Sequence, residues 1–193
     1  MQAAELGADA IGVVLYPESS RSVSVDALAG IVANVPESLT VVALFVNPEP
    51  YLVRQALATE SVDVLQFHGD ETADFCEQFN MPYMKAIAVS ADCDLKSALA
   101  PYEAAQYILL DSYDPIMPGG TGKAFDWGKV GELTELQQAR LVLAGGLRPD
   151  NVREAIKIVH PFGVDVSSGV EASKGIKDLN KMKLFIEGVR GSD

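Results

Sequence analysis

The chain has few residues of several kinds that often indicate a particular class of function. Among its 193 residues it has two cysteines, two histidines and one tryptophan, and its formal net charge is −12. Nucleic-acid binding normally needs a basic stripe, so this charge argues against a nucleic-acid partner. No apolar run is long enough to span a bilayer, and we expect no membrane partner either.

Cys76 and Cys93 have neither the spacing of metal ligands nor neighbouring histidines. We therefore expect no metal site, and we interpret both residues as reduced thiols in a cytoplasmic protein. A hydrophobic content of 48% over this length suits one domain with a full-sized core, covering residues 1–193.

Short, nearly continuous apolar segments recur along the whole chain. Runs of this kind are typical of strands buried on both faces, as in a parallel sheet. They predict strands over residues 10–16, 40–46, 62–68, 83–89, 107–111, 141–146 and 162–168.

Between these segments, apolar residues repeat at the i, i+3, i+4, i+7 spacing of a helix that faces a core. The first stripe runs from Leu28 through Ile31 to Val35 and follows Ser24, a candidate N-cap. Two more stripes cover residues 152–159 and 182–189, the last after Asp178. Strands alternating with helices throughout predict an α/β fold.

An α/β fold of this size is either an open doubly wound sheet or a closed barrel. A barrel gathers the carboxyl ends of its strands around one mouth, whereas an open sheet spreads them out. We predict a TIM-type (β/α)8 barrel with parallel strands, because polar residues or glycine stand at the end of nearly every predicted strand: Tyr16, Asn47, His68, Asp111, Gly145 and Ser167.

Glycine-containing loops occupy residues 119–123, 144–146 and 167–169 at three of the later strand ends. Glycine lets backbone N–H groups approach a ligand closely, and such groups hold phosphate. Ordinary turns are the competing interpretation. Two such loops on the final two strands, with a third just before them, favour phosphate binding.

Four polar side chains near strand ends each admit more than one interpretation. Asp111 can donate a proton at a barrel mouth or serve as a structural carboxylate, and Asp165 can orient a ligand or bond to nearby backbone. His68, on the same face as Gln66, is a base, a substrate donor or a core residue, and we favour a polar lining role. Arg21 can grip a carboxylate with two hydrogen bonds or remain a solvated loop charge.

Several strings together resemble the phosphoribosylanthranilate isomerase family over essentially the whole chain. They are YPESSR at 16–21, LQFHGDE at 65–71, LLDS at 109–112, GGTGK at 119–123, LAGGL at 143–147 and GVDVSSGVE at 163–171. The resemblance implies an Amadori rearrangement in tryptophan biosynthesis: N-(5-phosphoribosyl)anthranilate becomes 1-(2-carboxyphenylamino)-1-deoxyribulose 5-phosphate. This aldose–ketose isomerisation of a phosphosugar uses no metal or organic cofactor, and family members are monomers or homodimers.

Residue by residue, the resemblance implies that Asp111 is the general acid. Arg21 and Asp165 would face the anthranilate moiety, with His68 and Gln66 as further substrate-binding residues. The residues implied to surround the phosphate are Gly120, Gly122, Gly145, Gly146, Ser167, Ser168 and Gly169.

The family's general base is a cysteine at the end of its first strand, whereas this chain begins inside the following helix. We therefore expect an N-terminally truncated barrel without that strand, and impaired turnover by this chain. Cys76 and Cys93 are predicted in the outer helical layer and cannot replace the base. We hypothesise that the native gene product is longer; the alternative function is a non-catalytic phosphosugar-binding barrel remnant.

Overall fold

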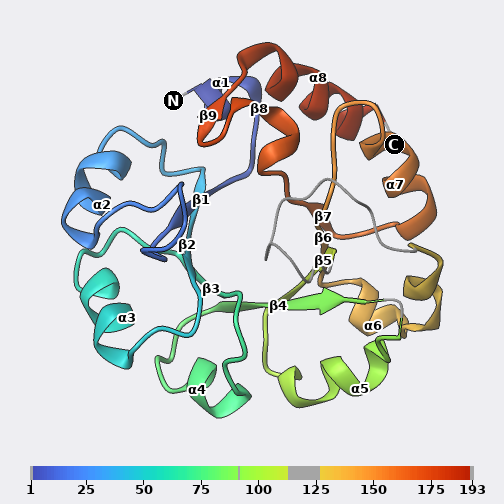
Figure 1. Ribbon diagram of the computed structural model, residues 1–193, viewed down its shortest axis with the longest axis horizontal. Coiled ribbons are helices and arrows are strands. Elements are labelled where there is room, and N and C mark those ends of the chain that lie inside the picture. Colours follow the sequence, from blue (N-terminus) through green and yellow to red (C-terminus); the bar gives the residue numbers. More distant parts are fainter. Residues whose placement is uncertain (1, 91, 113–126, 192–193) are drawn as a thin grey trace. The chain divides into compact units, whose positions relative to one another are not determined.

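The computed structural model describes residues 2–90, 92–112 and 127–191 (Figure 1). These residues form two compact units. The first comprises Met1–Lys85 and Ala104–Gln106, and the second comprises Ala86–Glu103 and Tyr107–Asp193. The prediction of one domain over residues 1–193 stays a prediction.

The first unit is built on parallel strands. Strands β1 (Ala10–Val14), β2 (Thr40–Phe45), β3 (Val64–Phe67) and the start of β4 (Tyr83–Val89) pair in this order. Every residue of β3 is buried, as the apolar run predicted. Because the strands are parallel, their carboxyl ends lie at one edge of the sheet.

Helices α2 (Val25–Val32), α3 (Pro50–Leu57) and α4 (Ala73–Glu77) lie along one side of these strands, after the short helix α1 (Gln2–Leu6) (Figure 1). The predicted N-cap at Ser24 is confirmed, since its side chain accepts from the backbone N–H of Ala27. The core-facing stripe predicted beyond Leu28 is wrong at Ile31, which is 43% exposed. Its helix ends at Val32, so the spacing does not continue to Val35.

Aromatic rings fill the space between β3 and α4. The ring of Phe67 lies 6.1 Å from that of Phe45 and 6.0 Å from that of Phe79, and both Phe45 and Phe67 are fully buried. Such packing stabilises the fold, both because apolar surface is buried and because the rings adopt favourable relative orientations. It fixes β3, and with it the residues that follow the strand.

The second unit contains the rest of β4 and three further strands in parallel order: β5 (Tyr107–Ser112), β6 (Leu141–Leu143) and β7 (Gly163–Val164). The last two strands are shorter than predicted. β6 stops because Gly145 and Gly146 take positive φ angles of 76° and 67°, which turn the chain out of the ladder.

The helices of the second unit are α5 (Leu95–Leu99), η1 (Ala100–Tyr102), η2 (Trp127–Glu132), α6 (Glu135–Gln138), α7 (Val152–Val159), η3 (Ser168–Val170) and α8 (Leu179–Arg190). An antiparallel hairpin of β8 (Glu171–Ser173) and β9 (Ile176–Lys177) precedes α8. Helices α7 and α8 pack side by side (Figure 1), and their predicted apolar stripes bury Val152, Ala155, Met182 and Phe185. In the described part of the chain, no helix has the length and apolarity to cross a membrane.

Candidate functional site

Asp111 stands near the carboxyl end of β5 and is buried, with 7% of its surface exposed. The turn after β6 presses against it. A Cβ at Gly145 would lie 2.8 Å from Asp111 Oδ1 and would collide with the backbone nitrogen of Ser112. Only glycine allows this approach, and the positive φ at Gly145 also favours glycine. The sequence thus brings a carboxylate and a glycine turn together across two neighbouring strands.

Ser112 is a residue of this site to which sequence analysis assigned no role. It is 6% exposed, and its Oγ would lie 2.7 Å from a Cβ on Gly145. Within the described residues this hydroxyl is buried and has no hydrogen-bond partner. The signal available in the sequence was a hydroxyl directly after the strand-end carboxylate.

The loop after β6 and the segment after β7 are in direct contact. A Cβ at Gly169 would overlap the carbonyl oxygen of Leu147 and would lie 3.2 Å from Val166 Cγ2. The structure therefore assembles five of the residues implied to hold phosphate: Gly145, Gly146, Ser167, Ser168 and Gly169. The other two, Gly120 and Gly122, lie outside the described residues.

Two lysines anchor the segment 167–171. Lys177 Nζ donates to the carbonyl of Ser167 at 2.7 Å and pairs with Glu171 Oε1 at 3.3 Å. Lys181 Nζ donates to the carbonyl of Glu171 at 2.7 Å. The two ammonium groups thus hold the backbone of the predicted phosphate loop in place. No local sequence motif indicated a role for Lys177 or Lys181, because it is the fold of the hairpin and α8 that brings them close to residues 167–171.

Asp165 directly follows β7 and is exposed. Its N–H donates to the carbonyl of Leu143 at 2.8 Å, so the backbone stays alongside β6 beyond the last assigned strand residue. Asp165 is therefore held at the same strand end as the glycine turn.

Three predicted site residues belong to the first unit. Gln66 is buried on β3, and its Nε2 lies 3.1 Å from the sulfur of Met84. His68 is half-buried just after β3, and Arg21 is half-buried in the loop after β1. Ser22, next to Arg21, pairs with Val14 in a parallel bridge, so the loop folds back along β1. His68 and Arg21 follow strands, as predicted, whereas Gln66 lies within β3.

The two cysteines lie in or beside helices of the described chain. Cys76 lies in α4 and is fully buried, and burial raises the pKa of its thiol from 9.0 to about 12. Cys93 is half-exposed and precedes α5. The predicted placement of both in or beside helices is confirmed.

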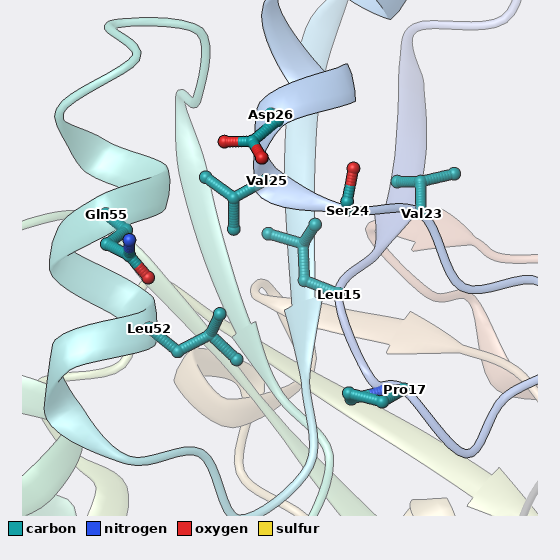
Figure 2. Close-up of a pocket in the computed structure, with 8 residues that line it drawn as sticks. All are labelled: Leu15, Pro17, Val23, Ser24, Val25, Asp26, Leu52 and Gln55. Atoms are coloured by element: carbon teal, nitrogen blue, oxygen red, sulfur yellow. The ribbon is translucent and has the colours of Figure 1, made fainter.

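The first unit also has a pocket of about 270 Å³ (Figure 2). Leu15, Val25 and Leu52 form its apolar floor, and Asp26 and Gln55 lie at its side. None of the predicted site residues lines it. The described residues contain no group of three or more His, Cys, Asp or Glu side chains that could hold a metal ion.

Solved structures share this arrangement over nearly the whole chain. Phosphoribosyl anthranilate isomerase from Thermotoga maritima matches with a TM-score of 0.87 and 39% identity, covering 98% of this chain and 92% of that one. A relative in complex with reduced 1-(o-carboxyphenylamino)-1-deoxyribulose 5-phosphate matches with a TM-score of 0.84 and 37% identity, over 98% and 91% of the two chains. The chain is thus an α/β protein of the TIM-barrel type, as predicted.

The sequence comparisons narrow this class. The family model described as N-(5'phosphoribosyl)anthranilate (PRA) isomerase matches residues 1–188. The N-(5'-phosphoribosyl)anthranilate isomerase of Pseudomonas fluorescens (strain SBW25) is 47% identical over 192 residues, which cover 100% of this chain and 90% of the relative. The counterpart from Nitrosococcus oceani is 46% identical over 189 residues, with 98% and 90% covered. The chain belongs to the PRA isomerase family, and the predicted family is confirmed.

Proposed function

We propose that this chain carries out the Amadori rearrangement of N-(5'-phosphoribosyl)anthranilate to 1-(2-carboxyphenylamino)-1-deoxyribulose 5-phosphate, in tryptophan biosynthesis. The observation that carries the proposal is the family match over residues 1–188. The packing of Asp111 against the glycine turn at Gly145 supports it, because an acid and a phosphate loop are what the reaction requires.

Asp111 is assigned the role of general acid. It protonates the ribose ring oxygen, and the ring opens to a Schiff base. Removal of the proton on the sugar C2 by a general base then gives an enolamine, which tautomerises to the ketone. A buried carboxylate held by packing suits the first step, because its position is set before the substrate binds.

Phosphate binding is assigned to the loops after β6 and β7. Gly145, Gly146, Ser167, Ser168 and Gly169 surround the phosphate, and the sugar then extends toward Asp111 on the adjacent strand. Gly120 and Gly122 are assigned to the same phosphate on the resemblance alone. Two anchor points on neighbouring strands would orient the sugar, which lowers the entropic part of the barrier.

Four residues are assigned to the rest of the substrate: Arg21 and Asp165 to the anthranilate moiety, and His68 and Gln66 to further polar contacts. Arg21 suits a carboxylate because its guanidinium can donate two parallel hydrogen bonds. The general base is assigned to neither Cys76 nor Cys93, because burial raises the pKa of the first thiol to about 12 and the resemblance places the base on a strand that precedes both residues.

The alternative is phosphosugar binding without turnover, which the absence of the family's base cysteine would explain; the family match over residues 1–188 favours isomerisation. The test generates phosphoribosylanthranilate in situ, follows its fluorescence decay, and separately measures binding of the reduced product analogue by calorimetry. Turnover supports the isomerase. Binding without turnover supports the alternative, and neither binding nor turnover contradicts both.

We further propose a cytoplasmic protein that is a monomer or a homodimer. One solved Thermotoga maritima relative is described as a set of monomers generated from a dimeric isomerase, so both states occur in that protein. Light scattering coupled to size-exclusion chromatography measures the mass in solution. A stable mass above twice 20.6 kDa would contradict the proposal.

A further inference from the structure

Lys85 and Glu71 form a buried ion pair in the first unit to which the proposed function assigns no role. Lys85 lies on β4 and Glu71 lies in the loop after β3; Nζ and Oε2 are 3.2 Å apart, and both side chains are 2% exposed. Taking two charges out of water is unfavourable, and well-packed apolar residues of the same volume are often as stable. Stability alone is therefore a weak explanation for the pair.

The ammonium of Lys85 grips the backbone on both sides of His68. Its Nζ donates to the carbonyl of Phe67 at 3.3 Å and to the carbonyl of Gly69 at 2.5 Å. The N–H of His68 itself donates to the carbonyl of Phe45 at 2.8 Å. The peptide group before His68 and the one after Gly69 are thus held in place, and the N–H of Gly69, which donates to Glu71, fixes the peptide group between them.

The carboxylate of Glu71 ties this segment to the loop that follows the neighbouring strand β2. Oε2 accepts from the N–H of Gly69 at 2.9 Å, and Oε1 accepts from the N–H of Asn47 at 2.7 Å. Asn47 closes the loop, since its Oδ1 accepts from the N–H of Asp70 at 2.8 Å. Gly69 is required here, because a Cβ would lie 2.7 Å from Asn47 Cγ.

We propose that Lys85 and Glu71 are positioning residues, which hold His68 at the carboxyl end of β3 for contact with the phosphosugar substrate. The proposal rests on the proposed function. Neither residue touches substrate in this account. Their directional, charge-assisted bonds to the backbone fix the imidazole before binding, so the ordering of this loop does not have to accompany binding.

The test measures the dissociation constant of the reduced product analogue by calorimetry for the unchanged chain, Lys85→Met, His68→Ala and the double variant. Methionine keeps most of the lysine stem and removes the charge. We expect each single substitution to weaken binding about 10-fold, the value of one charge-assisted hydrogen bond. The double variant should bind no more weakly than either single variant, because both remove the same contact.

Lys183→Met is the matched control, because Lys183 lies in α8 and pairs with Glu187 only at 3.9 Å on the exposed surface. It should leave binding unchanged. Since Lys85→Met strands a buried carboxylate and can unfold the protein, Lys85→Met with Glu71→Leu is measured in parallel, as it removes both charges.

Three results would overturn the inference. One is a folded Lys85→Met, Glu71→Leu variant with unchanged affinity. Another is a full additional loss when Lys85→Met is placed in the His68→Ala background, since independent effects add. If the unchanged chain does not bind the analogue, the proposed function fails first and the inference fails with it.

Discussion

The turn at Gly145 is packed against the carboxylate of Asp111, so closely that a Cβ on the glycine would lie 2.8 Å from Asp111 Oδ1. The same Cβ would collide with the backbone nitrogen of Ser112. The proposed acid and one wall of the proposed phosphate loop are therefore a single packed unit across β5 and β6. A change on either strand end is expected to displace the other.

Gly145→Ala should destabilise the protein by about 1–3 kcal/mol, because alanine at a φ of 76° is strained and its methyl group has no room. It should also lower kcat/KM by about 100-fold, since a displacement near 1 Å at a reacting group is enough for that. Urea unfolding and the fluorescence assay measure the two effects. Gly30→Ala is the control: Gly30 lies in α2 with no atom within 4 Å of a Cβ, so stability should rise by roughly 0.5–1 kcal/mol.

Asp111→Asn should lower kcat by about 10²- to 10⁴-fold, the usual contribution of a general acid, while the shape of the site is kept. Affinity for the reduced product analogue should change little, because the analogue needs no proton. Asp150→Asn is a suitable control, since Asp150 is an exposed partner of Arg148. Equal turnover by Asp111→Asn and the unchanged chain would contradict the assignment of the acid.

Ser112→Ala should change the free energy of unfolding by less than about 0.5 kcal/mol, although Ser112 is buried. No hydrogen bond to the described residues is lost, because its hydroxyl makes none there. Ser24→Ala removes a serine of the opposite kind, an N-cap oxygen that accepts from Ala27, and should destabilise by about 1 kcal/mol. Equal losses in the two variants, measured by urea unfolding, would show that Ser112 is hydrogen-bonded in the folded protein.

The thiol of Cys76 should make stability depend on pH in the alkaline range. Burial raises its folded-state pKa to about 12 from the usual 9.0, so the folded protein keeps a proton that the unfolded chain releases. Stability is therefore complete below pH 9 and falls between about pH 9 and pH 12. Cys76→Ala should flatten this part of the profile. In native thiol labelling at pH 8 only the half-exposed Cys93 should react, and fast labelling of Cys76 would contradict its burial.

Local sequence patterns predicted helices and strands correctly where one hydrophobic periodicity holds over the whole element. The strand at 83–89 and the helix at 152–159 have the predicted bounds, and the predicted N-cap Ser24 accepts a backbone N–H. The predicted strand over 141–146 ended early, since two glycines in the left-handed region outweigh an apolar run. Several of the strings that resemble the family lie at strand ends, and the same segments carry the candidate site residues.

The sequence by itself determined the α/β class, the family and the positions of Asp111 and the glycine loops, because each is encoded in a few neighbouring residues. Tertiary structure alone decided which groups meet. Lys85 reaches Glu71 across 14 residues, and Lys177 returns to Ser167 across 10. Such pairs leave no local pattern, because their members lie on different elements and are selected by strand register and packing. The contacts that hold His68 and the proposed phosphate loop in place are of this second kind.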